Sequence, residues 1–234
     1  MKKGFTLVEL LVVIAIIAIL LLLMAPSYST MMERARRNAC SNNHHQIMVG
    51  ASQYQANYGT YLGFPNWLWP EWQASPRGWV GPGWLYDISA GVTPGTWKAG
   101  DRETGWLWTY LKAEGLYRCP LEPGPYRGSN QLTSYLMTGA VIDFGRDWSA
   151  AGSRRMAKST DMNPLGVVFW EADEPGWNDG SSTPNEGLTI RHRDGATFGC
   201  ADGHTEYLTR QQYNIELSRR PSMLWCNPFQ ANGS

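Results

Sequence analysis

The chain begins with one long apolar stretch and continues as a sequence of mixed polarity. Sixteen consecutive apolar residues, with no glycine and no charge among them, run from Leu10 to Ala25. Counted from Phe5, the stretch has 21 residues, and as a helix it would be about 31 Å long. That length is enough to cross the hydrocarbon core of a bilayer. The pattern therefore predicts a membrane-spanning helix over residues 5–25.

Beyond Pro26 the hydropathy pattern becomes that of an amphipathic helix. No proline and only one glycine occur between residues 28 and 58. Apolar residues recur at helical spacing along one face: Cys40, Ile47, Ala51, Tyr54 and Tyr58. The other faces are polar, and they place the adjacent His44 and His45 in solvent. The two patterns together predict one helix over residues 5–57, bent at Pro26, whose second half packs on a globular domain.

Residues 58–133 form a region that is dense in Trp, Pro and Gly. The runs Asn66–Trp72 and Trp79–Trp84 keep no helical or strand period for long. One interpretation is an irregular region held in place by buried aromatic side chains. The alternative is a set of exposed aromatic faces that stack on sugars or other ligands. We favour the structural interpretation.

The last hundred residues predict a β-sheet. Short segments of strand character are separated by Gly, Pro, Asn or Asp: Ser134–Ile142, Gly166–Ala172, Leu188–His192, Ala196–Ala201 and His204–Leu208. No long helical pattern lies between them, so an antiparallel sheet is the simplest arrangement. The chain is therefore predicted to be α+β: a long N-terminal helix packed on an antiparallel sheet domain of residues 134–234.

The last two strand candidates predict a hairpin. Asp202-Gly203 lies between two segments of alternating character, which is a strong signal for a two-residue turn. In that register Phe198 would face Tyr207 across the two strands.

Two groups of polar residues are candidate metal ligands. His192, Asp202 and His204 have the chemistry to bind zinc or another divalent ion, but no fourth ligand or general base is evident. The hairpin accounts for the same residues without a metal, so a zinc enzyme is the weakest hypothesis. An acidic segment at residues 171–180 offers oxygen atoms suited to calcium, although its spacing is not that of an EF-hand.

Composition and motifs narrow the classes of function. The 20 Lys and Arg residues balance the 20 Asp and Glu residues, whereas a nucleic-acid partner favours a concentrated basic face. The sequence contains no Gly-x-Ser-x-Gly, no His-Glu-x-x-His and no phosphate-binding glycine loop. We therefore expect neither nucleic-acid binding nor enzymatic activity, and no cofactor.

The residues at the start of the apolar stretch distinguish between three interpretations. A secretory signal peptide has small residues at its cleavage site, and Ala25-Pro26-Ser27 fits that poorly. A plain anchor leaves Glu9 unexplained, because a carboxylate near a membrane is costly without a partner. The segment Lys2-Lys3-Gly4-Phe5-Thr6-Leu7-Val8-Glu9-Leu10 resembles the prepilin peptidase recognition sequence of type IV pilins and type II secretion pseudopilins.

This resemblance implies a specific maturation and location. Residues 1–4 would be a leader, cleaved between Gly4 and Phe5, and Phe5 would then be N-methylated. Glu9, the fifth mature residue, would act in assembly, and Pro26 would kink the helix. The implied partners are a prepilin peptidase, other pilin-like subunits and the membrane. The implied location is the bacterial inner membrane, crossed once, with the C-terminal domain periplasmic or extracellular in a filament.

Two further motifs resemble one subgroup of pilin-like proteins. Cys40 and Asn43 form a Cys-x-x-Asn on the predicted helix, and nine residues separate His192 from Asp202-Gly203. The subgroup is named for this His-x9-Asp-Gly motif.

The four cysteines are widely spaced, with no Cys-x-x-Cys pair. An even number of cysteines in an exported chain indicates disulfides. Cys40 lies on the stripe that faces the domain, and Cys119 follows a short apolar segment expected to run nearby. We therefore predict a Cys40–Cys119 disulfide that ties the helix to the domain, while the pairing of Cys200 and Cys226 stays open.

The sequence thus predicts a structural pilin-like subunit of a type IV pilus or a type II secretion pseudopilus. The alternative is a membrane-tethered envelope protein that binds a glycan or protein ligand through its Trp-rich domain.

Overall fold

The structure is a computed structural model that describes residues 4–59, 63, 66, 82–93, 95–122, 124–126, 131–142, 157–173, 180–189, 191–226 and 228. Its longest element is helix α1, Leu7–Tyr58, which is close to the predicted helix of residues 5–57. The helix runs through two compact units, Met1–Asn38 and Ala39–Ser234. Its first turn is closed by Thr6 and Glu9. The Thr6 hydroxyl accepts from the Glu9 N–H at 3.3 Å, and the Glu9 carboxylate accepts from the Thr6 N–H at 2.8 Å.

The second half of α1 is buried along the predicted stripe. Four of its five apolar residues are almost fully buried: Cys40, Ile47, Ala51 and Tyr54. The fifth, Tyr58, is 60% exposed, because it is the last residue of the helix. The expectation that His44 faces solvent is wrong, since this side chain is fully buried. The buried face is wider than the stripe because protein covers α1 from two sides.

A five-stranded sheet covers one of these sides. Its strands are β1 (Leu136–Thr138), β2 (Val167–Trp170), β3 (Ser181–Ser182), β4 (Gly195–Cys200) and β5 (Thr205–Thr209). Their order in the sheet is β3-β1-β2-β4-β5. All neighbours are antiparallel except β1 and β3, which are parallel. The α+β class is confirmed, and the fully antiparallel sheet is corrected to a mixed one.

Two parts of the strand prediction differ from the structure. The two-residue strand β3 was not predicted, because Ser-Ser carries no hydrophobic alternation. No strand forms at the described residues of Leu188–His192, where His192 makes only an isolated bridge with Gly195.

The β4–β5 hairpin forms with a register one residue away from the predicted one. Phe198 pairs with Glu206 rather than Tyr207. The reason is the turn. Gly203 lies in the left-handed region with φ 89° and donates to the Cys200 carbonyl at 2.9 Å, so Asp202-Gly203 occupies the last two positions of the turn rather than its centre. A glycine in this position extends the loop and shifts the pairing.

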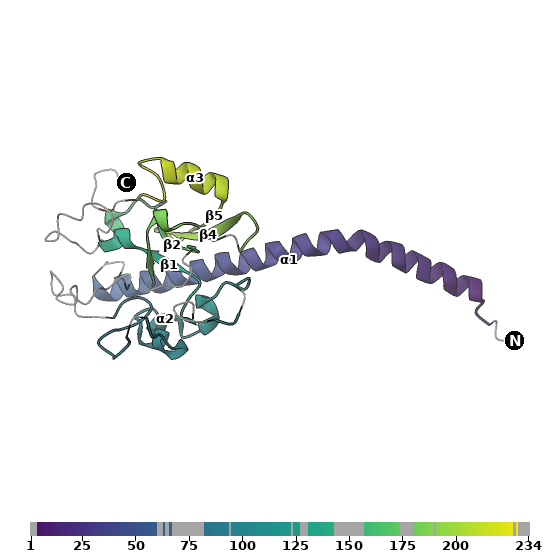
Figure 1. The fold of residues 1–234 in the computed structure, drawn as a ribbon, viewed down its shortest axis with the longest axis horizontal. Helices are drawn as coiled ribbons and strands as arrows, with labels where there is room; N and C mark the ends of the chain where they lie inside the picture. Colours follow the sequence, from purple (N-terminus) through teal and green to yellow (C-terminus); the bar gives the residue numbers. More distant parts are fainter. Residues whose placement is uncertain are drawn as a thin grey trace. The chain divides into compact units, whose positions relative to one another are not determined.

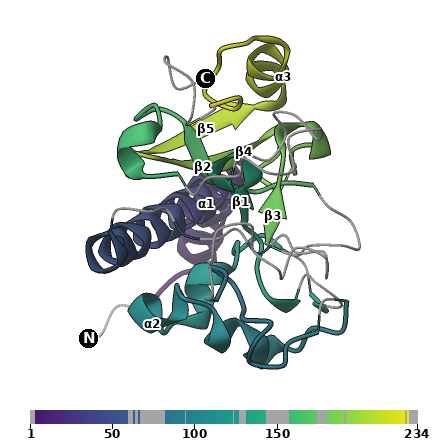
Figure 2. The same cartoon turned by 90° about the vertical axis from the view of Figure 1, so that its left-hand side faces the viewer.

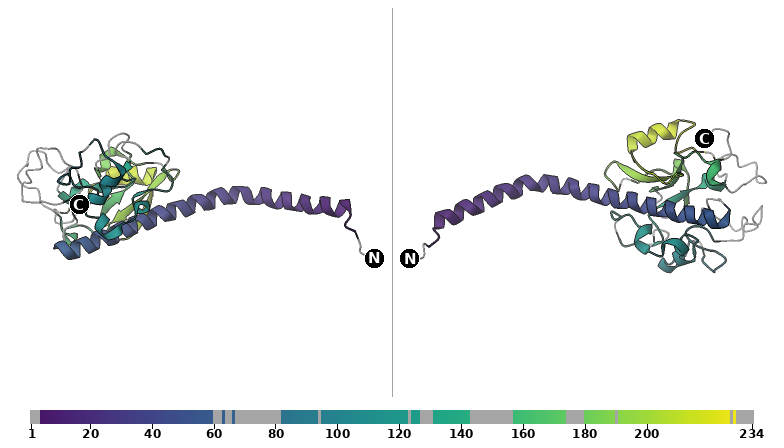
Figure 3. Two further views of the ribbon diagram at one scale, coloured as in Figure 1. Left: turned by 90° about the horizontal axis from the view of Figure 1, so that it is seen from below. Right: turned by 180° about the vertical axis from the view of Figure 1, so that it is seen from behind.

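The sheet lies between α1 and helix α3, Arg210–Ser218 (Figures 2 and 3). On the α3 side, Phe198 packs on Tyr213 with ring centroids 6.2 Å apart. On the α1 side, Gly199 lies against His44 and Met48. Each face of the sheet therefore has its own apolar cluster.

Short helical segments cover the other side of α1, across from the strands (Figure 1). They are η2 (Ala99–Thr104), α2 (Trp108–Leu111) and η3 (Glu114–Tyr117). Further 3-10 turns are η5 (Gly139–Ile142), η6 (Ser159–Asp161) and η7 (Pro184–Glu186). Trp106 stacks on Tyr54 with centroids 4.3 Å apart, and Gly50 lets Leu107 approach the helix closely.

Three tryptophans of the Trp-rich region are almost fully buried: Trp84, Trp97 and Trp106. Their faces pack inside the domain, so a stacking surface for ligands does not include them. The run at residues 67–81, which carries Trp67, Trp69, Trp72 and Trp79, lies outside the described residues.

Candidate functional site

Two cysteines, a glutamate and a histidine meet inside the second unit, where α1 packs on the rest of that unit. Cys40 comes from α1, Cys119 follows η3, Glu171 follows β2, and His192 precedes β4. Each is at most 1% exposed. Their ligand-type atoms, two sulfurs, one carboxylate oxygen and one ring nitrogen, all lie within 4.8 Å of one another.

Each side chain in this cluster contacts the next, in the order Cys119, His192, Glu171 and Cys40. The Cys119 sulfur is 3.5 Å from Nε2 of His192. The same nitrogen is 3.3 Å from Oε2 of Glu171. The Cys40 thiol donates to Oε1 of Glu171 at 3.8 Å. The carboxylate therefore lies between the helix cysteine and the histidine.

Glu171 is fully buried, and its contacts favour the charged form of its carboxylate. Burial alone raises its pKa, but hydrogen bonds and the positive charge of His192, with the backbone bond from Thr197, hold that pKa below the ordinary value. The Thr197 N–H and hydroxyl both donate to Oε2, at 3.0 Å each. Burial likewise lowers the pKa of His192, and its contacts with Cys119 and Glu171 outweigh that effect and raise it. These contacts favour the charged forms of both side chains, which can stabilise each other as a buried, hydrogen-bonded pair.

Cys119 is held by its own backbone surroundings. Its N–H donates to the Ser134 hydroxyl at 2.9 Å. Its sulfur accepts from the N–H of Leu121, two residues later, at 3.4 Å. In the protonated cluster, the hydrogen bond with Cys40 and burial raise the pKa of the Cys119 thiol.

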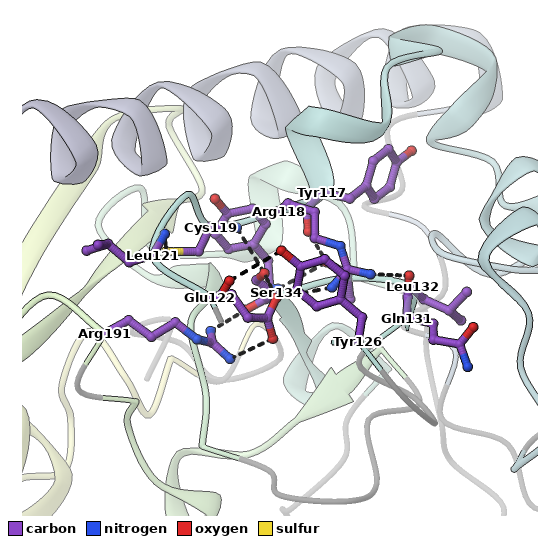
Figure 4. Close-up of polar contacts among 12 residues, drawn as sticks. Tyr117, Arg118, Cys119, Leu121, Glu122, Tyr126, Gln131, Leu132, Ser134 and Arg191 are labelled. Carbon is purple, nitrogen blue, oxygen red and sulfur yellow. Dashed lines mark hydrogen bonds and ion pairs between the residues drawn. The ribbon is translucent and has the colours of Figure 1, made fainter. Parts of the chain in front are cut away.

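A second polar network fixes the segments that carry Cys119 and His192. Oε2 and Oε1 of Glu122 accept from Arg118 and Arg191, respectively, at 3.1 Å each. The Ser134 hydroxyl donates to the same carboxylate, and Figure 4 shows these contacts converging on Glu122. Arg118 directly precedes Cys119, and Arg191 directly precedes His192. The network therefore helps to position both Cys119 and His192 in the cluster.

The structure separates the residues that the sequence grouped as a metal site. His192 lies in the buried cluster, at the start of the β4–β5 hairpin. Asp202 and His204 lie in the turn at its far end, where they bond to each other. The carbonyl of Gly203 in that turn accepts a hydrogen bond from Nδ1 of His45 on α1, at 3.0 Å. The structure therefore does not bring His192, Asp202 and His204 together.

Glu171 is the site residue that the sequence analysis missed. The sequence analysis grouped it with an acidic segment at residues 171–180 that offers oxygen atoms suited to calcium, and residues 174–179 of that segment lie outside the described residues. A signal was present: Glu171 directly follows the four apolar residues of β2, which are all buried. A carboxylate in that position is carried into the core, where it needs a partner.

The predicted cysteine pair is adjacent in the structure. The sulfurs of Cys40 and Cys119 lie within 4.8 Å of each other, and all four cysteines are free thiols. The disulfide between them stays a prediction.

The N-terminal residues carry the other candidate site. Phe5 is 74% exposed, and the large apolar side chains of residues 7–23 are 45–74% exposed. No single helix among the described residues is both long and apolar enough to span a membrane. The bent pair Leu7–Leu23 and Tyr28–Tyr58 meets that requirement together, by length and composition.

Comparison with known families matches two segments of the chain. Residues 1–25 match the prokaryotic N-terminal methylation motif, so the chain is pilin-like in its N-terminal segment, as predicted. Residues 29–161, more than half of the chain, match a family described as a protein of unknown function (DUF1559). The chain belongs to this family. The His-x9-Asp-Gly segment lies beyond the matched residues. No curated protein and no solved structure matches the chain.

Proposed function

We propose that this protein is a structural subunit that a prepilin peptidase processes and that assembles into a type IV pilus or a type II secretion pseudopilus. The N-terminal methylation motif at residues 1–25 carries this proposal. In it, the peptidase cuts between Gly4 and Phe5, and Phe5 is methylated.

The surface of the first part of α1 supports assembly through the helix. Apolar side chains point outward on every face between residues 7 and 23. A helix that is apolar all round needs a lipid or protein environment on all sides. The bilayer supplies that environment before assembly, and the helices of neighbouring subunits supply it in a filament. The domain is then periplasmic before assembly and extracellular or periplasmic within the filament.

Glu9 has a specific role in this proposal. Its carboxylate bonds to the N–H and hydroxyl of Thr6 at the start of α1. A carboxylate surrounded by apolar helices is costly unless a positive group joins it. Cleavage before Phe5 creates such a group, a positively charged amino terminus. Glu9 of one subunit therefore pairs with the amino terminus of its neighbour and sets their register.

The test replaces Glu9 by alanine in cells that assemble the filament. We expect Glu9→Ala to be processed normally, because the cut lies at Gly4, but to be lost from the filament fraction. Mass spectrometry of the N-terminus reports processing, and immunoblotting of sheared filaments reports incorporation.

The matched control is Glu33→Ala, a glutamate on the same helix outside the apolar stretch. It should be incorporated like the wild type. Normal incorporation of Glu9→Ala would overturn the assembly role, and a wild-type chain that still begins at Met1 would overturn the processing.

A further inference from the structure

We propose that Cys40, Cys119, Glu171 and His192 bind a zinc ion that fastens α1 to the sheet domain. This site is distinct from filament assembly and does not depend on it. The proposal rests on the separation of the four ligand atoms, on their chemistry and on the bonds that support them.

The separations match those of tetrahedral zinc ligands. With zinc–sulfur bonds of about 2.3 Å and zinc–nitrogen or zinc–oxygen bonds of about 2.0–2.2 Å, neighbouring ligand atoms in a tetrahedron are about 3.3–3.8 Å apart. The sulfur–nitrogen distance of Cys119 and His192 is 3.5 Å, and the nitrogen–oxygen distance of His192 and Glu171 is 3.3 Å. The Cys40 sulfur lies 3.8 Å from Oε1 of Glu171, whereas His192 lies beside Oε2 of the same carboxylate. With one carboxylate oxygen counted, the four ligand atoms all lie within 4.8 Å of one another, so the longer separations must contract when an ion binds.

The donor set selects zinc among the common divalent ions. Two cysteine sulfurs with one imidazole exclude magnesium and calcium, which prefer oxygen ligands. Sulfur and nitrogen donors at tetrahedral spacing are typical of zinc. Four protein ligands leave no open position for water or substrate. The site is therefore structural, in the manner of closed zinc sites.

Bonds from neighbouring residues favour the metal-binding form of two ligands. The N–H of Leu121 points at the Cys119 sulfur, which stabilises a thiolate over a thiol. Thr197 donates twice to Oε2 of Glu171, and such bonds orient a ligating carboxylate. These donors also offset the third negative charge that two thiolates and one carboxylate place around a doubly charged ion.

Zinc binding and the Cys40–Cys119 disulfide are competing uses of the same two sulfurs. A disulfide would join the helix to the segment after η3 but leave Glu171 and His192 as an ion pair. Zinc would use all four side chains and would join four segments of the chain. The presence of Glu171 and His192 around the two cysteines favours zinc.

The first test uses the full chain, purified in detergent with a reductant and stripped with a chelator. Cobalt is the probe, because its spectrum reports the ligands. We expect one equivalent of cobalt to produce thiolate-to-cobalt charge-transfer absorption and the intense visible bands of a tetrahedral site. Zinc should then displace cobalt, since it binds such sites more tightly. A folded, reduced chain that binds neither ion stoichiometrically would overturn the proposal.

Variants locate the binding. Cys119→Ser and His192→Ala should each abolish the charge-transfer absorption or stoichiometric binding. Cys200→Ser is the matched control, a buried cysteine of β4 that is not in the cluster, and it should bind like the wild type. Equal loss in Cys200→Ser would contradict the assignment.

A ligand substitution could abolish binding simply by unfolding the chain, so a milder variant is also needed. Thr197→Val keeps all four ligands and removes one bond to Glu171, so we expect the zinc dissociation constant to rise about 10-fold. An unchanged constant would contradict the arrangement. A Cys40–Cys119 disulfide peptide in a non-reduced digest of the membrane-bound protein would overturn zinc binding in favour of the disulfide.

Discussion

Two buried glutamates show how single residues hold this domain together. Glu122 is balanced by two arginines, each 3.1 Å away. Glu171 is balanced by one histidine and by two hydrogen bonds from Thr197. Neither carboxylate contributes by its charge alone, because transfer of an ion out of water costs several kcal/mol unless partners replace the water. Their partners come from distant parts of the chain, so each glutamate fixes a tertiary contact.

Glu171→Ala is expected to destabilise the reduced, metal-depleted chain by about 3–5 kcal/mol, because it leaves the buried His192 without its partner. Urea unfolding followed by tryptophan fluorescence measures the change. Glu206→Ala, on the exposed side of β5, should change the free energy of unfolding by less than about 0.5 kcal/mol. Similar effects of the two substitutions would contradict the role of Glu171.

Gly4→Val is expected to block removal of the leader, because a branched side chain next to the cut hinders the backbone that glycine leaves open. Mass spectrometry of the N-terminus should show an uncleaved chain, whereas the wild type should begin with methylated Phe5. Gly100→Val, at a position where an added Cβ meets no atom within 4 Å, should be cleaved normally. Cleavage of Gly4→Val at the wild-type rate would count against the prepilin interpretation.

The elements differ in how well local sequence determines them. Helix α1 was predicted nearly to its ends, because its hydrophobic period persists over many turns. Strands β1, β2, β4 and β5 were also predicted, since each lies in an apolar or alternating segment between turn residues. Strand β3 has only Ser181 and Ser182 and forms because Met137 and Thr138 lie beside it. Such a pairing depends on residues far away in the sequence, so no local sequence pattern predicts it.

The β4–β5 hairpin shows the same limit within a single turn. The residues Asp202-Gly203 correctly predict a turn, but they fit both a two-residue loop and a longer loop that ends in a left-handed glycine. The difference is one residue of register, which moved the partner of Phe198 from Tyr207 to Glu206.

Gly195→Ala is expected to destabilise the domain by about 1–3 kcal/mol, because this strand position has no room for a side chain. An added Cβ would lie 2.1 Å from the carbonyl oxygen of Leu208, and backbone cannot give way as a side-chain end can. Gly100→Ala serves as the control and should be neutral. Thermal unfolding of both variants compares them, and a neutral Gly195→Ala would show that β4 and β5 are less closely paired than described.

At the scale of the whole molecule, the sequence indicated the family, the α+β class and the proximity of Cys40 and Cys119, but not that Glu171 and His192 join these two cysteines. The His-x9-Asp-Gly motif singled out His192, and the apolar stripe of the predicted helix included Cys40. Their meeting with Cys119 and Glu171 joins residues 40, 119, 171 and 192, which only the assembled fold brings together. The sequence motif instead grouped His192 with Asp202 and His204, because these residues are close in sequence. In the fold they lie at the other end of β4.

Zinc is expected to stabilise the whole domain, because the four ligands come together only in the folded chain. At a free concentration 100 times its dissociation constant, zinc should raise the free energy of unfolding by about 2.7 kcal/mol. Urea unfolding of the reduced chain, with zinc and with chelator, measures the difference. Cys119→Ser should show no difference between the two conditions, and a zinc effect of equal size in this variant would place the ion elsewhere.

Cys40 is the first residue of α1 that is fully buried among those whose side chains are described. If the chain assembles through α1 as proposed, tension on a filament would pass along the helix backbone and reach the buried core of the domain at this residue. The contacts of Cys40 with Glu171 and Cys119 would therefore be the first fully buried side-chain contacts of the described helix to bear this tension. In the proposed filament, the buried cluster would resist separation of the helix from the domain at the point where that separation would start.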